Sequence, residues 1–283
     1  RSSDLAIFDG QGHVIKGFTG TSTQNYFGIF GVISTGALIE NFTIYGDINS
    51  TYQCVGSVAG YARDATPTIR NIHSFVNINN TYAGGRQGGI LGSSNNGTVV
   101  VDRCWYSGTL DGNDAGGSGN YGGIVGYLNN NTAAILTVSN CLFDGKVVNN
   151  NATPGNCTFG GVIGYNNGGK ATIKNCLSIG TVTSTVTGQF FGKLNGNNST
   201  FANNYYMGEF VNGTGSAGAA SGDEPVLVDE GQLESDEIVL KLGIAFRQNL
   251  GKDDYPVLDA THNVVTEITD AGYATLFVDN ADL

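Results

Sequence analysis

The side chains best suited to hydrolytic chemistry are few in this 283-residue sequence. Its histidines are His13, His73 and His262, and none lies in a zinc-binding HExxH string. Neither GxSxG nor GDSG occurs, and GGSGN at 116–120 is better explained as loop glycine than as a nucleophile elbow. A peptidase needs a nucleophile, a base and an oxyanion hole. No catalytic set is therefore predicted, and we expect His13, between glycines, to be a turn or edge residue.

Charged loop residues suggest a second kind of chemistry, the cleavage of acidic polysaccharides. Parallel β-helices can do this with paired carboxylates, or with calcium and a basic residue. The candidates are Arg63, Asp64, Arg86, Asp111 and Asp114. Isolated loop aspartates are mostly turn formers. We predict no cofactor beyond passive calcium binding by such carboxylates, and we keep Asp111 and Asp114 as binding candidates.

Aromatic side chains suit a third chemistry, stacking on sugar rings or contact with a partner protein. Tyr82, Trp105, Tyr106 and Tyr121 are the candidates, and we expect about half of such residues to be core residues instead. Trp105 follows Cys104 in a strand-like run, so their side chains should face opposite ways. With Cys104 inside, Trp105 points outward and is the favoured binding residue.

Composition limits the class of partner. Lys and Arg number 13 against 24 Asp and Glu, and the net charge of −11 repels phosphate backbones and anionic membrane surfaces. Glycine occurs 44 times, yet 40% of residues are hydrophobic, so disorder is a poor explanation of the glycine content. Apolar runs fall far short of the roughly 20 residues that cross a bilayer. We predict neither a nucleic acid partner nor a transmembrane segment.

Two phrases recur in the same order six times between residues 27 and 210. The first phrase includes QGGILGS, YGGIVGY and FGGVIGY, and its last glycine falls at Gly31, Gly60, Gly92, Gly126, Gly164 and Gly192. The second includes TIRNIHSFV, VVDRCWYSG, TVSNCLFDG and TIKNCLSIG. Short β-branched and aromatic runs bounded by Gly, Asn and Ser predict strands. A unit of this size buries its apolar face by stacking on its neighbours. We therefore predict an all-β fold, a parallel, right-handed β-helix solenoid of about six rungs with a short C-terminal helix and strand cap.

Aligned positions of the second phrase indicate which residues stack. One position holds Asn41, Asn71, Arg103, Asn140, Asn175 and Asn203, and we expect the asparagines to form a structural ladder of amide hydrogen bonds. The next position holds Cys104, Cys141 and Cys176, which we expect to be buried thiols rather than disulfides. Arg103 breaks the first column and should lie beside a bulge or pair with Asp102 or Asp144. The five cysteines form no CxxC pair, so no metal site is predicted.

The same patterns divide the chain into five parts. We predict an entry hairpin over 1–26, the solenoid over 27–212, a flexible link over 213–228, a capping helix with an extended segment over 229–260, and two strands over 261–283. The last part is either a small β-element in its own right or the start of a further domain.

The two phrases resemble the GLUG repeat family, and the match is carried by GGILG, GGIVGY, GGVIGY and the following NCLFDGKV and NCLSIGTV. The resemblance covers about residues 5–258 and departs from the family pattern at Ser57 and in the degenerate sixth copy, QFFGKL. Family members include adhesin-like surface proteins of secreted bacterial type, particularly from Bacteroidetes. They also include repeat regions of proteins assigned as immunoglobulin A peptidases, in which a separate domain is catalytic. The resemblance implies a secreted or cell-surface location with flanking domains, and it carries over no catalytic residue.

The leading hypothesis is a noncatalytic extracellular adhesive, binding or scaffold module of a larger surface protein, with a glycan or host protein surface as partner. Two alternatives stay open. One is a polysaccharide-cleaving β-helix enzyme, and the other is the accessory repeat region of a secreted immunoglobulin A peptidase-like protein.

Overall fold

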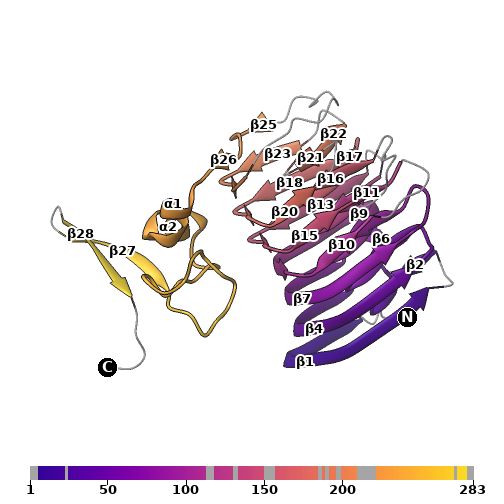
Figure 1. Cartoon of the computed structure of the whole chain (residues 1–283), viewed down its shortest axis with the longest axis horizontal. Coiled ribbons are helices and arrows are strands. Elements are labelled where there is room, and N and C mark those ends of the chain that lie inside the picture. Colours follow the sequence, from indigo (N-terminus) through magenta and orange to yellow (C-terminus); the bar gives the residue numbers. More distant parts are fainter. Residues whose placement is uncertain are drawn as a thin grey trace.

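The fold is an all-β solenoid, as predicted. The computed structural model describes residues 6–22, 25–112, 118–129, 133–149, 157–183, 187–188, 191–195, 199–208, 221–270 and 273–278. Within these residues, parallel strands wind through about five turns, and two short helices follow the solenoid (Figure 1).

One side of the solenoid is a six-stranded parallel sheet that takes one strand from each copy of the first phrase. Its strands are β2 (Tyr26–Phe27), β5 (Cys54–Gly56), β8 (Arg86–Gly88), β11 (Asn120–Gly122), β16 (Thr158–Gly160) and β21 (Thr187–Gly188). Neighbouring strands pair in register, so that Tyr121 lies between Gln87 and Phe159. The six sequence copies therefore contribute neighbouring strands on successive turns of the coil.

The remaining solenoid strands belong to one 20-stranded sheet whose pairings are also parallel. Its N-terminal members are β1 (Ile7–Ser22), β3 (Phe30–Ile33), β4 (Leu38–Ser50), β6 (Ala59–Ala65), β7 (Thr68–Asn80), β9 (Leu91–Tyr106) and β10 (Thr109–Asp111). The central members are β12 (Val125–Leu128), β13 (Ala134–Ser139), β14 (Leu142–Phe143), β15 (Lys146–Val148), β17 (Ile163–Asn167), β18 (Lys170–Lys174), β19 (Leu177–Ser178) and β20 (Thr181–Thr183). The last members are β22 (Phe191–Asn195), β23 (Ser199–Ala202), β24 (Tyr205–Tyr206), β25 (Ser221–Gly222) and β26 (Val226–Leu227).

Glycines of the first phrase make room for aromatic rings inside the coil. A Cβ built on Gly123 would lie 2.1 Å from the carbonyl oxygen of Gly161 and 2.4 Å from the Phe143 ring. Distances this short are forbidden by van der Waals overlap, so a side chain at Gly123 would force the rungs apart.

Ser57 stands where most copies have this glycine. In the rung of Ser57, the interior residue that takes the place of the aromatic ring is Ser74. In the next rung, the residue in register with Ser74 is the much larger Tyr106. Ser57 is buried, and its hydroxyl donates a hydrogen bond to the carbonyl of Gly89. The departure from the repeat is thus accommodated by a second small residue and a new hydrogen bond.

The expected N-terminal hairpin is wrong. Strand β1 runs parallel to β4 and adds a further strand to the solenoid. Gln11 and Gly12 do form a bend, with φ of 51° and 75°, and the register of β1 shifts between Asp9 and His13. These left-handed residues turn a corner of the coil without reversing the chain.

The C-terminal cap contains two helices instead of the single helix expected. Helix α1 (Glu230–Glu234) begins with a capping box between Asp229 and Gln232, and α2 (Asp236–Leu242) begins at Ser235. The Ser235 backbone is extended, and its hydroxyl accepts a hydrogen bond from the amide of Glu237, so it ends one helix and starts the next. The helices pack apolar side chains on the solenoid, and β27 (Val265–Asp270) and β28 (Tyr273–Val278) then form an antiparallel pair. Figure 1 shows this pair on the far side of the helices from the solenoid.

The acidic surplus belongs to the C-terminal part. Residues 1–220 contain ten Asp and Glu against ten Lys and Arg, whereas residues 221–283 contain fourteen against three. The solenoid sequence is therefore neutral overall, and the charge repulsion expected from the whole chain does not apply to it. Among the described residues, no helix has the length and apolar character needed to span a bilayer.

A buried glutamine provides a test of this packing. The side chain of Gln87 is fully buried, and neither its amide nitrogen nor its oxygen has a hydrogen-bond partner among the described residues. Leucine is one bond shorter and has no polar side-chain atoms, so replacing Gln87 by leucine removes a desolvation cost of about 1 to 2 kcal/mol. Gln87→Leu should therefore raise the free energy of unfolding, measured by urea titration.

Gln248 is the matched control for this substitution. It is also fully buried, but its amide donates to the carbonyl of Leu233 at 2.7 Å. Gln248→Leu should lower stability, because it leaves that carbonyl without its donor. Equal losses at the two positions would contradict the assignment of Gln87 as a destabilising residue.

Candidate functional site

The asparagine column forms a corner of the coil in the left-handed backbone region. The φ angles of Asn41, Asn71, Arg103, Asn140, Asn175 and Asn203 lie between 49° and 61°. Asparagine tolerates this conformation better than most residues with a Cβ atom. The residue type is therefore selected by the backbone as well as by the amide group.

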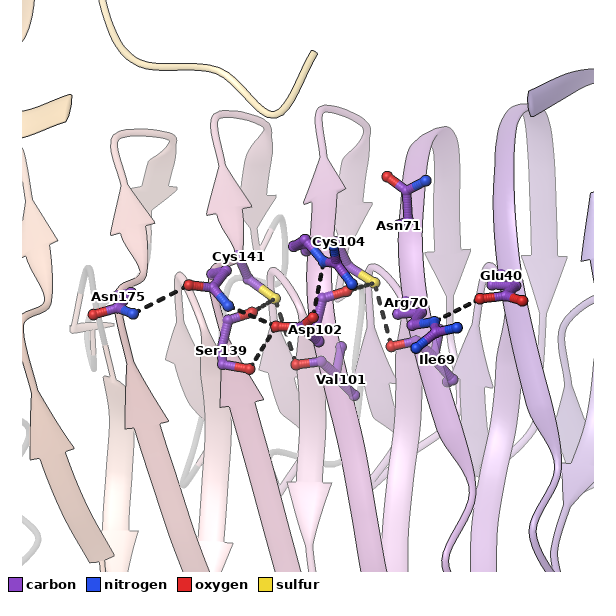
Figure 2. Close-up of polar contacts among 12 residues, drawn as sticks. Glu40, Ile69, Arg70, Asn71, Val101, Asp102, Cys104, Ser139, Cys141 and Asn175 are labelled. Carbon is purple, nitrogen blue, oxygen red and sulfur yellow. Dashed lines mark hydrogen bonds and ion pairs between the residues drawn. The ribbon is translucent and has the colours of Figure 1, made fainter. Parts of the chain in front are cut away.

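Side-chain hydrogen bonds run along this column, and Figure 2 shows the one that Asn175 donates. Asn71 donates to Asn41 at 2.7 Å, and Asn175 donates to Asn140 at 3.1 Å. Asn203 in turn donates to Asn175 at 2.9 Å. Each of these side-chain amides therefore donates a hydrogen bond to the preceding rung, and the bonds connect successive corners of the coil.

Asp102 replaces the amide acceptor where Arg103 interrupts the column (Figure 2). Its carboxylate accepts hydrogen bonds from Ser139 and Asn140, both at 2.7 Å, and pairs with Arg103 at 2.9 Å. Of the two acids considered as partners for Arg103, the structure selects Asp102. The adjacent Cys104 and Cys141 are buried free thiols whose Sγ atoms contact backbone carbonyls. These contacts are structural and leave no reactive thiol at the surface of the column.

A groove of about 300 Å³ runs beside this corner, between the outer faces of β4, β7 and β9 and the segment 258–260. Its polar walls include Asn41, Asn71 and Arg103 on the solenoid and Asp259 opposite. Its floor includes Thr43, His73 and Trp105, which pairing of the three strands places side by side. Amide, guanidinium, carboxylate and aromatic groups thus converge in one concave site.

Aromatic rings continue from the groove along the outer face of the solenoid. His73 stacks on Trp105 with ring centroids 3.7 Å apart, and it lies 3.9 Å from Phe75. Phe75 stacks in turn on Tyr45 at 4.4 Å, and Tyr45 is 38% exposed. The result is a row of rings that begins under the C-terminal segment and ends in solvent.

Trp105 faces away from the solenoid core, as strand alternation predicted, because Cys104 is fully buried. The C-terminal cap then covers much of its ring, so that Trp105 packs with the cap core. Its indole N–H has no hydrogen-bond partner among the described residues. Trp105 therefore anchors the cap and also forms part of the groove.

A chain of polar contacts connects the groove to the cap. His73 Nε2 lies 3.0 Å from the Ser107 hydroxyl, which donates to Asp144 at 2.6 Å. The other oxygen of Asp144 accepts from the Tyr255 hydroxyl at 3.0 Å. Since Ser107 donates to the carboxylate, it accepts from the imidazole, which fixes the neutral tautomer with hydrogen on Nε2.

These residues do not form a catalytic triad. In a triad the imidazole lies between the hydroxyl and the carboxylate and removes the hydroxyl proton. Here the hydroxyl of Ser107 lies between His73 and Asp144. Burial also lowers the pKa of His73 to about 3, with Asp259 opposing the shift through its charge. A base this weak does not activate serine near neutral pH.

The other predicted aromatics are divided between core and surface. The expected exposure of Tyr121 is wrong: it is fully buried and stacks on Phe159 at 4.9 Å, because the middle residue of β11 points inward. Tyr106 is also fully buried, with its hydroxyl donating to the carbonyl of Val76, since it shares the inward face of β9 with Cys104. Tyr82 lies in the turn after β7 and is 38% exposed.

Of the predicted charged loop residues that the structure describes, only Arg63 and Asp64 form an ion pair with each other. Arg63 pairs with Asp64 at 3.7 Å on the surface, and Asp111 ends β10 in a partly buried position. Arg86 lies in a different pocket. Asp114 lies outside the described residues. Within the described part of the chain, no group of three or more His, Cys, Asp or Glu could hold a metal ion, and calcium binding stays a prediction.

The three histidines come from different parts of the fold. His13 is on exposed β1, whereas His262 lies 3.6 Å from both Asp253 and Asp259 in the cap. The role of His73 was missed by motif reasoning. Its signal was the repeat register, which aligns it with Trp105. The position of Asp259 in the groove could not be inferred in this way, because its segment has no counterpart among the repeats.

Comparison with known proteins supports the architecture. No protein-family model matches the sequence, and no curated protein does so either. Among solved structures, a putative immunoglobulin A1 protease from Bacteroides ovatus is similar, with a TM-score of 0.64 and 20% sequence identity. The match covers 88% of this chain and 76% of that one. At this identity the similarity shows a shared fold.

The asparagine corner predicts an unusual order of substitutions. Asn175→Gly and Asn175→Ala lose the same amide bonds, but alanine also strains the backbone at φ 52°. Asn175→Ala should therefore be less stable than Asn175→Gly by about 1 kcal/mol in urea unfolding. Asn79, in the regular strand β7, is the control, and there alanine should be the more stable replacement.

The lowered pKa of His73 predicts a dependence of stability on pH. The unfolded chain binds a proton at the usual pKa of about 6.5, whereas the folded chain does so near 3. Stability should fall as pH drops through this window, by about 1 to 2 kcal/mol between pH 7 and pH 5. His73→Phe keeps an aromatic ring and should remove that part of the loss. Identical profiles of stability against pH for the wild type and His73→Phe would contradict the buried neutral state of His73. The matched control is the same substitution at His13, which is exposed.

Proposed function

We propose that this chain is a noncatalytic glycan-binding module, and that the groove beside the asparagine corner holds the sugar. The observation that carries the proposal is the row of stacked rings from Trp105 to Tyr45, bordered by planar polar side chains. Sugar rings present apolar C–H faces and a periphery of hydroxyl groups. The exposed ring of Tyr45 at the end of the row suits the first feature, and the amide and guanidinium groups of the groove suit the second.

The lining chemistry favours binding over reaction. Asn71 and Arg103 offer N–H donors, and Asp259 offers carboxylate acceptors. Such groups fix the orientation of a ligand in a concave site without forming a bond to it. The histidine in the floor has a pKa too low for general base catalysis, and its hydroxyl neighbour is bound to a carboxylate.

We also propose that this chain is one module of a larger protein. The repeat phrases resemble the GLUG family, and the fold resembles that of the Bacteroides ovatus protein, which supports a repeat module within a secreted surface protein. In such a protein the module would attach the whole molecule to a glycan-coated surface. An accessory role beside a catalytic domain is the related alternative.

The first test is a glycan array with the full chain, followed by calorimetry on the strongest ligand. Tyr45→Leu should weaken binding about tenfold, equivalent to about 1.4 kcal/mol, by removing the exposed ring. Tyr82→Leu is the control, since Tyr82 has the same exposed fraction of 38% but does not belong to the row of stacked rings that includes Tyr45. Loss of binding in the Tyr82 variant alone would move the site to the turn after β7.

A second pair of variants tests the polar wall. Asn71→Gly removes an amide from the groove while keeping the backbone conformation, and it should weaken binding about fivefold. Asn96→Gly is matched, because Asn96 has the same φ of 53° and lies outside the groove. Failure of glycan and host-protein arrays to yield a ligand, or turnover of a polysaccharide by the chain, would overturn the proposal.

A further inference from the structure

A second polar pocket lies on a different part of the solenoid. It has a volume of about 520 Å³ and is bounded by side chains from β8, β11, β12, β16 and β17. The residues that define it are Arg86, Ser118, Asn120, Tyr127, Thr158 and Tyr165. It shares no lining residue with the groove near Trp105.

Arg86 is held in this pocket by an aromatic ring. Its guanidinium carbon lies 4.0 Å from the centroid of Tyr127. Stacking of this kind uses the face of the guanidinium and keeps its in-plane N–H donors available, and one of them contacts the side chain of Cys54 on the paired strand. Asn120 and Thr158 are positioned nearby by a hydrogen bond of 3.0 Å between their side chains.

Arg86 differs from the other arginines of the solenoid. Arg63, Arg70 and Arg103 pair with Asp64, Glu40 and Asp102, respectively. No described carboxylate forms an ion pair with Arg86. A partly buried guanidinium stacked on a ring therefore faces a pocket whose described lining contains no acid.

The charge distribution permits an anion here. The surplus of acidic residues lies after residue 220, and the first 220 residues are balanced. Surface charges more than about 8 to 10 Å apart are largely screened at physiological salt. Local attraction to Arg86 therefore outweighs the net negative charge of the chain.

We propose that the Arg86 pocket binds the carboxylate of an acidic sugar residue. A carboxylate accepts two parallel hydrogen bonds from the guanidinium edge, which a neutral sugar cannot do. The hydroxyl and amide groups of Ser118, Asn120 and Thr158 border the same space and suit the hydroxyl groups of a sugar ring. This site would select charged glycans independently of the aromatic groove.

The test uses matched sugars with the full chain in calorimetry. Sialyllactose is compared with lactose, and galacturonate oligosaccharides are compared with their carboxyl-reduced forms. We expect binding of at least one carboxylated probe and at least tenfold weaker binding of its neutral counterpart. Arg86→Gln should abolish this discrimination, and Arg86→Lys should retain part of it because lysine keeps the charge but not the fork. Arg63→Gln is the control outside the pocket.

A rim substitution keeps the test valid if Arg86 is needed for folding. Ser118 is exposed, so Ser118→Glu can place a carboxylate beside Arg86 without altering the core, whereas Ser118→Gln adds the same bulk without charge. The first should block acidic probes and the second should not. Equal binding of charged and neutral probes, no binding of any probe, or full discrimination by Arg86→Gln would overturn the proposal. Asn71→Gly should leave the discrimination intact, which separates this site from the groove.

Discussion

Parallel stacking in register is the constraint on which the rest of the structure depends. Each rung places a side chain next to its counterpart in the following rung, at the spacing of neighbouring strands, about 4.8 Å. The side chain at each repeat position must therefore pack well against a side chain of the same or a similar type in the neighbouring rung. Rings stack on rings inside the coil, as Tyr121 does on Phe159, and amides donate to amides at the corner. Glycine is required where such rings meet the neighbouring backbone, as at Gly123.

The same constraint explains the charge of the chain. Like charges in adjacent rungs would repel at short range, so a column of Asp or Lys is unfavourable, whereas a column of Asn is not. At two places the solenoid instead sets a charge next to an opposite one, in the pairs Arg70 with Glu40 and Arg103 with Asp102. The capping part has no such columns, and it contains the acidic surplus. Among the described arginines of the solenoid, Arg86 differs in that no described carboxylate forms an ion pair with it.

Repetition also determined what the sequence could predict. Six copies of two phrases were enough to predict the fold, the strand positions and the inward direction of Cys104, because each copy repeats the same pattern of residues. Single features were less predictable. Ser235 looked like one residue of a continuous helix, although its capping hydroxyl divides the helix in two. The bend at Gln11 resembled a hairpin turn, since local residues encode a left-handed conformation but not the direction in which the chain continues. Tyr121 was misplaced because a three-residue strand between glycines offers too little alternation to assign its face.

The groove could not be predicted for a related physical reason: one of its walls comes from the cap, which has no repeat register. That wall is fixed by polar contacts rather than by apolar packing alone. Apolar surfaces tolerate sliding, whereas a buried hydrogen bond has a narrow range of distance and direction. The chain from Tyr255 through Asp144 and Ser107 to His73 therefore defines where the segment 255–260 lies on the solenoid. Because His73 is both the end of that chain and part of the groove floor, cap position and groove shape depend on the same buried, neutral imidazole. Protonation of His73 would thus loosen the cap and alter the groove together.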